Sequence, residues 1–437
     1  MNLLEKTGIL NIYPKSKKKS IHISRRIDIF FILALLVLII SPLLINLFLK
    51  LETEIRQINL FLSPRFEELF GKEATESLLL EFMEQNPDLR IRLISAADEQ
   101  SADILIFDEG EYRALAAAGA LVELNSYINS KTPDGFETGG KQLALPLVTF
   151  MDLLFYNIEL LTAAGFDRPP KTREEFLAYA RAVSGGNDAL PENAAAAALS
   201  LSRQDRQAIS RDVFSWMWAS GIDFLPEEEA PVLDVRSVSS VLSFLGALYN
   251  ESLLAWGIFD TTGDQRLEEF AQGKIAMMIA STCAIPYLRE KMGDDVFGIT
   301  TVPLSGVSSG LAGKYGIGLS SIYAGIYAES EYPDEAWSFL EFLARQNLLF
   351  SEVFKAVPGV VSEINSCDYV RDDPFYSKAY DIFESSAIVQ GFSGNPGAEE
   401  YENAFLEELQ AFFTSNRSPQ DTINAIQRRW DEIGGAQ

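Results

Sequence analysis

Carboxylates are the side chains of this sequence best placed for chemistry. Asp108, Glu109, Asp152 and Asp260 fall where strands or loops are expected to end. A glycosidase uses two such carboxyl groups, spaced across the sugar that it cleaves. The chain contains 62 acidic residues, so two of them can lie close together by coincidence. A carboxylate-dependent glycosidase therefore remains an alternative, and we expect no enzyme.

Histidine is nearly absent, which excludes several classes of catalytic and metal site. The single histidine, His22, lies in the basic N-terminal stretch. The rest of the chain therefore has no imidazole base, no Ser-His-Asp triad and no histidine metal ligand. The sequence also contains no P-loop, dinucleotide-binding or nucleophile-elbow motif. We expect no cofactor and no bound metal ion.

The two cysteines, Cys283 and Cys367, lie 84 residues apart and form no CxxC pattern. They would be able to form a disulfide in an oxidising compartment. The interpretation that we favour is two separate, buried, small apolar side chains.

Charge is distributed very unevenly along the chain. The net charge is −26, yet residues 1–26 hold seven Lys or Arg and one acid. From Lys50 onward there are 29 basic and 60 acidic residues. Binding to phosphates needs clustered Lys and Arg, so this body is not expected to bind nucleic acid.

An apolar segment near the N-terminus predicts a membrane anchor. Residues 29–49 carry no charge, and 21 residues are enough to span a bilayer core of about 30 Å. The positive-inside rule makes residues 1–26 a cytoplasmic tail and 27–49 a transmembrane helix. A cleaved signal peptide is the alternative, although its apolar part is usually shorter. In both cases the rest of the chain lies outside the cytoplasm.

Strands and helices alternate from residue 55 onward. Strands are expected at 55–62, 91–94 and 103–107, with helices at 67–85 and 111–120 between or after them. This alternation predicts an α/β domain with a mainly parallel sheet covered on both faces.

Residues 145–183 predict a strand followed by two helices. Gly165 ends the first helix, because glycine adopts the left-handed turn without strain. Pro169 and Pro170 then prevent helix formation. Thr172 and Glu175 have the spacing of a capping box that begins the second helix.

The second half is expected to be mostly helical. Helices are predicted at 204–220, 235–249, 263–271, 333–345, 374–385, 398–414 and 419–433, with strands at 275–279, 296–302 and 316–327. The Pro, Gly and Ser residues of 303–314 predict a loop that crosses between domains or acts as a hinge.

Three segments, together with the C-terminal one, resemble the sugar-binding group of extracellular solute-binding proteins of ABC importers, which includes maltose-binding protein. The residues that carry the resemblance are Leu145, Pro146, Tyr156, Asn157, Ala164, Gly165, Pro169, Pro170, Thr172 and Glu175; Phe270, Gly273, Lys274, Ala276 and Met277; Ala336, Trp337, Phe339, Leu340 and Pro358; and the run SPQDTINAI near the C-terminus. The four segments occur in the order of the family, over about residues 55–435.

The resemblance implies a bilobed, periplasmic-binding-protein-like type II α/β fold that closes around a ligand by hinge motion. Lobe one would contain residues 54–147 and 313–355, and lobe two residues 148–305 and 356–437. Strands that cross between the lobes would form the hinge.

The resemblance also implies which residues bind the ligand. The implied residues lie in loops that face the cleft: Ser63, Arg65, Phe66, Asp108, Glu109, Thr149, Phe150, Asp152, Ser281, Thr282 and Tyr315. Their hydroxyls, carboxylates and aromatic rings suit a carbohydrate or another small polar solute.

The function that follows from this resemblance is solute binding without covalent chemistry. The chain would be anchored in the cell membrane by a single helix, with its body outside the cytoplasm, and would deliver the solute to ABC permease subunits. An anchored sensor or interaction module of the same fold is the alternative, in addition to the glycosidase.

Overall fold

The computed structural model describes residues 55–95, 101–128, 137–138, 141–186, 189–191, 193–205, 208–222, 224, 231–304, 315–358, 367–389, 392, 395, 397–415 and 417–435, together with Val37, Leu38 and Ser41. The chain divides into two compact units, Met1–Arg56 and Gln57–Gln437. Most of the predicted 27–49 anchor and of the predicted 303–314 loop lies outside the described residues. Among the residues that are described, no helix is long and apolar enough to cross a membrane.

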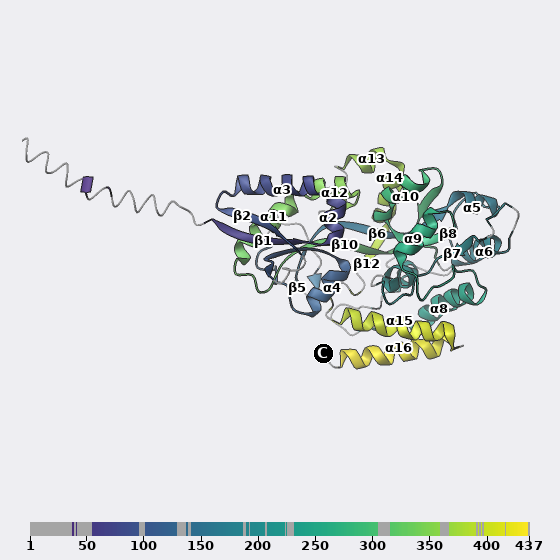
Figure 1. The fold of residues 1–437 in the computed structure, drawn as a ribbon. Coiled ribbons are helices and arrows are strands. Elements are labelled where there is room, and N and C mark those ends of the chain that lie inside the picture. Colours follow the sequence, from purple (N-terminus) through teal and green to yellow (C-terminus); the bar gives the residue numbers. More distant parts are fainter. Residues whose placement is uncertain are drawn as a thin grey trace, which may run out of the picture. The chain divides into compact units, whose positions relative to one another are not determined.

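The second unit contains one mixed sheet with helices around it (Figure 1). Its strands are β1 (Arg56–Leu62), β2 (Leu89–Ile94), β3 (Ile104–Asp108), β6 (Leu145–Asn157), β7 (Ala195–Ala197), β8 (Ile275–Ser281), β9 (Phe297–Thr300), β10 (Tyr315–Ile326), β11 (Val357–Pro358) and β12 (Ser386–Val389). The main strand order is β2-β1-β3-β10-β6-β8-β7. A separate hairpin pairs β4 (Glu137–Thr138) with β5 (Lys141–Gln142).

The expectation of a mainly parallel sheet was wrong at its centre. β1 and β3 are parallel, as predicted, and so are β7 and β8. The two longest strands, β6 and β10, pair antiparallel with each other, and they also run antiparallel to β8 and β3 respectively. β10 returns through the middle of the sheet late in the chain, and sequence periodicity cannot indicate where such a distant strand inserts.

The helices mostly match their predicted positions. They are α2 (Pro64–Phe70), α3 (Lys72–Gln85), α4 (Glu109–Ala117), α5 (Ile158–Ala163), α6 (Arg173–Ser184), α7 (Ser215–Ala219), α8 (Val235–Asn250), α9 (Gly263–Ala271), α10 (Ile285–Met292), α11 (Pro333–Arg345), α12 (Asn347–Phe354), α13 (Asp368–Asp372), α14 (Pro374–Ser385), α15 (Ala398–Thr414) and α16 (Pro419–Gly434), with a π-helical turn η2 (Ser210–Phe214) and a 3₁₀ turn η3 (Thr282–Ala284).

Two local differences from the predicted helices have simple causes. The helix expected at 67–85 is two helices, because Gly71 takes a φ of 85° between α2 and α3. The capping box at Thr172 is only half formed. Thr172 Oγ1 accepts the Glu175 N–H at 3.2 Å, but the Glu175 carboxylate accepts the N–H of Lys171 instead of that of Thr172. Gly165 has the predicted left-handed conformation, with a φ of 94°.

The apolar interior forms two regions along β6 and β10. The first region contains Val148 and Phe150 of β6 with Ile322 and Ala324 of β10, and the related cluster around Phe107, Tyr112 and Tyr323. The second region contains Met151, Leu153 and Phe155 of β6 with Ile317 of β10, and the cluster around Trp218, Phe405 and Trp430. Both strands therefore contribute side chains first to one region and then to the other.

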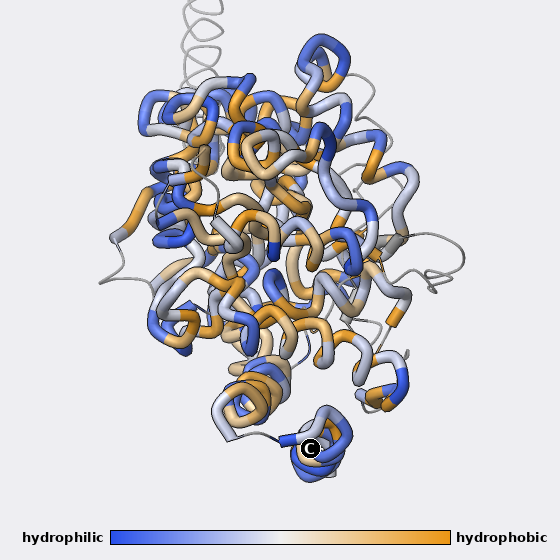
Figure 2. Tube along the Cα trace, turned by 90° about the vertical axis from the view of Figure 1, so that its right-hand side faces the viewer, coloured by the Kyte–Doolittle hydropathy of each residue, from blue (hydrophilic) through white to orange (hydrophobic). Residues whose placement is uncertain are grey.

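Amphipathic helices cover the second region. The C-terminal helices α15 and α16 pack side by side, and α16 alternates hydrophobic and hydrophilic residues beside the C-terminus in Figure 2. Its buried face carries Ile423, Ile426 and Trp430. Spacings of three and four residues place these side chains on one face of the helix.

Candidate functional site

A cavity of about 240 Å³ lies where α4 approaches α15 and the segment that leads into η2. Its lining residues are Gly110, Arg113, Ala114, Arg203, Asp205, Ile209, Glu399, Glu402, Asn403 and Leu406. α4 packs through Tyr112 in the first core region, whereas α15 packs through Tyr401 and Phe405 in the second. Side chains from both regions therefore meet at this cavity, which makes it the candidate site.

Arg113 of α4 connects the two regions through an ion pair. Its Nη1 donates to Glu402 Oε2 of α15 at 2.5 Å, and its Nε lies 3.6 Å from Glu109 Oε1. Both Arg113 and Glu402 have less than a tenth of their surface exposed. Burial raises the pKa of Glu402, although Arg113 opposes this shift. A buried pair of this kind stabilises the protein only while both partners are present.

Hydrogen bonds complete this network at both ends. Ser210 donates to Glu402 Oε1 at 3.0 Å, and the Tyr323 hydroxyl of β10 donates to Glu109 Oε2 at 2.7 Å. The Arg113 Nε has no hydrogen-bond partner although it is buried. This Nε is closed off from solvent and lies in the ion pair with Glu109 Oε1.

A second buried arginine, Arg211 of η2, lies between two carboxylates that are close to it in sequence. Its Nη2 is 3.0 Å from Asp205 Oδ2, and its Nε is 2.8 Å from Asp212 Oδ1. Asp205 also accepts the Gly263 N–H at 2.7 Å, and Asp212 accepts the Ser200 N–H at 2.6 Å. Burial raises the pKa of Asp212 against the opposing effect of Arg211.

Asp152 of β6 is a third acidic position, and its carboxylate accepts no hydrogen bond from the residues that the structure describes. It is 7% exposed. Burial raises its pKa to about 7; Arg211 and Arg113 lower it, and Asp212 and Glu109 raise it further. Asp152 therefore lies within electrostatic reach of both arginine networks.

The predicted ligand residues occupy different environments, and their role in binding stays a prediction. Ser63 caps α2 through the Phe66 N–H, and Asp108 caps α4 in a complete capping box with Glu111. Thr149 Oγ1 lies 2.8 Å from Ser321 Oγ in the interior. Ser281 caps η3. The side chains of Arg65 and Tyr315 are outside the described set.

Two of the predicted ligand residues lie in the apolar interior. Phe66 is 1% exposed and stacks on Phe70 at a centroid distance of 5.2 Å. Phe150 is buried in the same core. Their packing favours a scaffold role, because an aromatic ring surrounded by other side chains has no free face for a solute.

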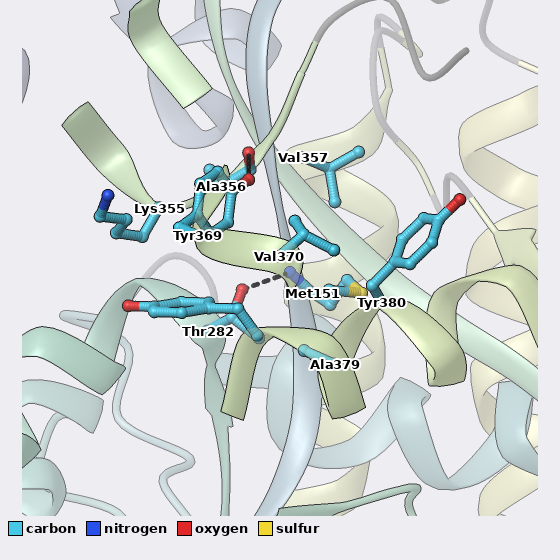
Figure 3. Close-up of a pocket in the computed structure, with 10 residues that line it drawn as sticks. Met151, Thr282, Lys355, Ala356, Val357, Tyr369, Val370, Ala379 and Tyr380 are labelled. Carbon is cyan, nitrogen blue, oxygen red and sulfur yellow. Dashed lines mark hydrogen bonds between the residues drawn. The ribbon is translucent and has the colours of Figure 1, made fainter. Parts of the chain in front are cut away.

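A smaller pocket contains Thr282, another predicted residue (Figure 3). Thr282 Oγ1 accepts the Met151 N–H at 3.1 Å, the bond drawn in Figure 3. The Tyr369 hydroxyl donates to the Ala356 carbonyl at 2.5 Å on the other side. The volume of about 10 Å³ is close to the space of a single water molecule. This pocket is too small for a solute.

Sequence reasoning missed Arg113, Arg211 and Glu402. The signal for Glu402 is present in α15, where it falls on the helix face of Ala398, Phe405 and Leu409. A charged residue within an apolar stripe predicts a buried ionic contact, because an unpaired charge there would be very unfavourable. The partner, Arg113, was not predictable from local sequence.

No group of three or more potential metal ligands occurs among the described residues. Cys283 and Cys367 form no disulfide; Cys367 is buried, as expected, but Cys283 is only half-buried. This arrangement agrees with the interpretation of two separate side chains.

Comparisons with known proteins identify the family. Residues 80–357 match the model of the bacterial extracellular solute-binding protein family. A binding protein of Brucella abortus (strain 2308) is 24% identical over 213 residues, which are 48% of this chain and 48% of the relative. The chain thus matches about half the length of that relative. An ABC transporter-binding protein of Deinococcus radiodurans is 19% identical over 68% of this chain and 70% of its own length.

Solved structures agree with the fold. The maltose-bound MalE3 protein of T. maritima superposes with a TM-score of 0.66 at 20% identity, over 87% of this chain and 100% of that structure. The cyclic alpha-maltosyl-1,6-maltose binding protein of Arthrobacter globiformis gives a TM-score of 0.70 at 16% identity, over 86% of this chain and 98% of that structure. UgpB of Mycobacterium tuberculosis, in complex with glycerophosphocholine, gives a TM-score of 0.67 at 18% identity, over 87% of this chain and 99% of that structure. The match to the family model covers more than half of the sequence, and the chain belongs to the bacterial extracellular solute-binding protein family.

Proposed function

We propose that this protein binds a sugar or a similar small polar solute outside the cytoplasm and delivers it to an ABC importer. The observation that carries the proposal is the cavity of about 240 Å³ between elements of two core regions, in a chain of this family. Ligand pockets typically form at such boundaries between packed units. The Deinococcus relative, named for an ABC transporter, supports the assignment to transport.

Hinge closure is the proposed binding motion. In this proposal residues 54–147 and 313–355 form one lobe, and residues 148–305 and 356–437 form the other. The change of core region between Phe150 and Met151 on β6 supports a boundary close to the proposed one. Small changes of backbone angle in β6 and β10 would then move one set of helices relative to the other.

The groups at the cavity suit noncovalent binding of a polar solute. The carboxylate of Glu399 can accept hydrogen bonds from hydroxyl groups, and the amide of Asn403, which also lines the cavity, can donate to hydroxyl oxygens. The predicted ligand residues Ser63, Asp108, Glu109 and Asp152 would contribute when the lobes close. Binding of this kind forms and breaks no covalent bond.

Residues 27–49 are the proposed single-pass anchor, with residues 1–26 in the cytoplasm. The uncharged length and the preceding basic cluster support this part of the proposal. An anchored body would stay close to the permease subunits that receive the solute. The alternative is an anchored sensor or interaction module of the same fold, for which solute binding would not lead to uptake.

Thermal unfolding of the full chain in detergent tests solute binding directly. The probes are maltose, tagatose, a cyclic maltooligosaccharide and glycerophosphocholine. A ligand at 100 times its Kd should stabilise the folded state by about 2.7 kcal/mol. If none of a broad panel of sugars and small polar solutes raises the melting temperature, solute binding is refuted.

Two substitutions of alanine by tryptophan on α4 test whether the solute binds in this cavity. Ala114 lines the cavity, whereas Ala117 is exposed on the same helix and does not. Ala114→Trp should fill the cavity and abolish the ligand-induced shift, and Ala117→Trp should preserve it. Equal shifts in both variants would place the solute elsewhere. Loss of solute uptake on deletion of the gene would favour transport over the sensor alternative.

A further inference from the structure

We propose that the ion pair between Arg113 and Glu402 is a latch that holds the two proposed lobes closed at the cavity, whether or not a solute is bound. This inference rests on the proposed function and adds a conformational device to it. The geometry that points to it is a buried ion pair whose partners lie in different proposed lobes, each with a further partner in its own lobe.

The latch joins parts of the chain that hinge opening would separate. Arg113 belongs to α4 and Glu402 to α15, and these two helices are in contact, side by side in Figure 1. α4 falls in the proposed lobe one and α15 in the proposed lobe two. Among the ion pairs formed between described residues, this is the one that joins the two proposed lobes. Separation of the lobes at this point therefore breaks the latch.

The closed latch is well buried and well supported. The Arg113 and Glu402 side chains are 9% and 8% exposed, and their closest atoms lie 2.5 Å apart. A buried ion pair compensates for the water that it displaces only when its geometry is good and further hydrogen bonds satisfy the groups that remain. The second carboxylate oxygen of Glu402 has such a bond, because Ser210 donates to it at 3.0 Å. The closed arrangement therefore meets the conditions for a stabilising pair.

Each half of the latch is built within its own proposed lobe. In lobe two, Ser210 holds Glu402. In lobe one, the Arg113 Nε lies 3.6 Å from Glu109 Oε1, and the Tyr323 hydroxyl donates to Glu109 Oε2 at 2.7 Å. Neither set of contacts crosses between the proposed lobes, so both charged groups would keep a partner after opening. The latch can therefore break without leaving a charge unpaired, as a reversible switch requires.

The latch also forms part of the candidate site. Arg113 and Glu402 both line the cavity of about 240 Å³. The walls that they belong to would have to move apart when a solute enters or leaves. Release of a solute to a permease would therefore require the latch to open.

Arg211 provides an internal comparison. It is also a buried arginine, but both of its carboxylate partners, Asp205 and Asp212, lie with it in the proposed lobe two. Hinge opening would leave these contacts unchanged. The two networks share their chemistry and differ in whether they cross between the lobes, so the second network supplies the control.

Single-molecule energy transfer in the full chain in detergent, with no solute added, measures opening. One dye is attached at Leu80→Cys on α3 of lobe one and the other at Gln420→Cys on α16 of lobe two, since both positions are exposed. Cys283→Ala and Cys367→Ala remove the native thiols. With the latch intact, one short-distance population should dominate.

Arg113→Gln, Glu402→Gln and the double variant remove the latch. Each should populate a longer distance and lower the ratio of closed to open molecules about tenfold. The double variant should open the protein no further than either single variant, because both changes remove the same contact. It also leaves neither charge of the pair behind, so it provides a measurement if a single variant fails to fold.

Asp212→Asn is the matched control. Like Glu402→Gln, it removes a buried carboxylate from an arginine, but its partner Arg211 lies in the same proposed lobe. It should change the ratio of closed to open molecules by less than about twofold. Far-UV circular dichroism checks that every variant is folded.

The outcomes separate this inference from the proposed function. If the latch variants keep the distances of the unchanged protein, or if Asp212→Asn opens it equally, the inference is overturned. A protein that is mostly open with its latch residues intact also overturns it. None of these results involves a solute, so the proposed function would still stand. Opening of the latch variants alone would support the latch even if the thermal unfolding test refuted solute binding.

Discussion

Arg113 and Arg211 have the same chemistry but different positions in the fold. Each is a buried arginine between two carboxylates. The partners of Arg211, Asp205 and Asp212, lie within six residues of it. The partners of Arg113 come from α4 and from α15, which pack in different core regions. The ion pairs of Arg211 fix a local turn, whereas the ion pair between Arg113 and Glu402 holds α4 and α15 together.

The largest expected loss of stability comes from removing Arg211 from its network with Asp205 and Asp212. Arg211→Met removes the guanidinium from between Asp205 and Asp212, while the hydrogen bonds that these carboxylates accept from the Gly263 and Ser200 N–H groups remain. We expect a loss of about 3–5 kcal/mol in the free energy of unfolding at pH 7, measured by urea denaturation. A loss below about 1 kcal/mol would show that Arg211 does not hold this turn.

Removing the charge of Asp152, whose pKa is influenced by both arginines, should have the opposite effect and raise the stability. Its pKa is about 7 in the folded protein and lower in the unfolded chain, so its ionisation destabilises the fold. The stability linked to its proton is complete below about pH 4 and is lost as the pH rises through about 7. Asp152→Asn should therefore stabilise the protein by on the order of 3 kcal/mol at pH 8 and have little effect at pH 4. Urea denaturation at both pH values measures this change in stability. An equal gain in stability at pH 4 and pH 8 would contradict the raised pKa of Asp152.

Arg113→Met should cost less than Arg211→Met, about 1–3 kcal/mol by urea denaturation. The reason is that Glu402 lines a cavity wide enough for water, which can hydrate the carboxylate left behind. This variant should also loosen the contact between α4 and α15, seen as faster amide hydrogen exchange in both helices. Exchange that increases in α4 alone would indicate that the pair does not join the two core regions.

The smallest effect is expected at an exposed pair. Arg168 and Glu175 form a two-point ion pair with N···O distances of 2.7 and 2.9 Å, but 44% and 33% of these two side chains are exposed to solvent. Arg168→Met should leave the urea midpoint nearly unchanged, because solvent screens exposed charges. If it destabilised the protein as much as Arg211→Met, burial would not explain the difference between the networks.

Local sequence predicted helix boundaries correctly where capping residues and glycine conformation set them. The Thr262–Gln265 capping box begins α9, and Asp234 caps α8, and both helices begin at the predicted residues. Gly165 ends its helix as predicted. The split at Gly71 was missed, because one glycine within an apolar periodic stretch is compatible with a continuous helix. The return of β10 through the centre of the sheet was missed for a different reason, since no local pattern specifies a distant partner.

The candidate site was predictable only in part. The sequence directed attention to the loop ends at Asp108, Glu109 and Asp152. In the structure Glu109 lies 3.6 Å from Arg113, which lines the cavity, but neither Glu109 nor Asp152 is among the lining residues. The sequence offered no reason to choose Arg113 and Glu402, which are 289 residues apart. Trp216 and Trp218, whose pattern in the sequence favours a core role over a platform for a sugar ring, are part of the core.

The sequence by itself determined the family, the alternation of strands and helices, the acidity of the body and the absence of histidine chemistry. These properties follow from composition, short motifs and periodicity, which act over a few residues. The tertiary structure decided which charges share the cavity and which stay within one core region. Burial and long-range pairing set those relations, because a carboxylate such as Glu402 acquires its environment only when α15 packs against α4.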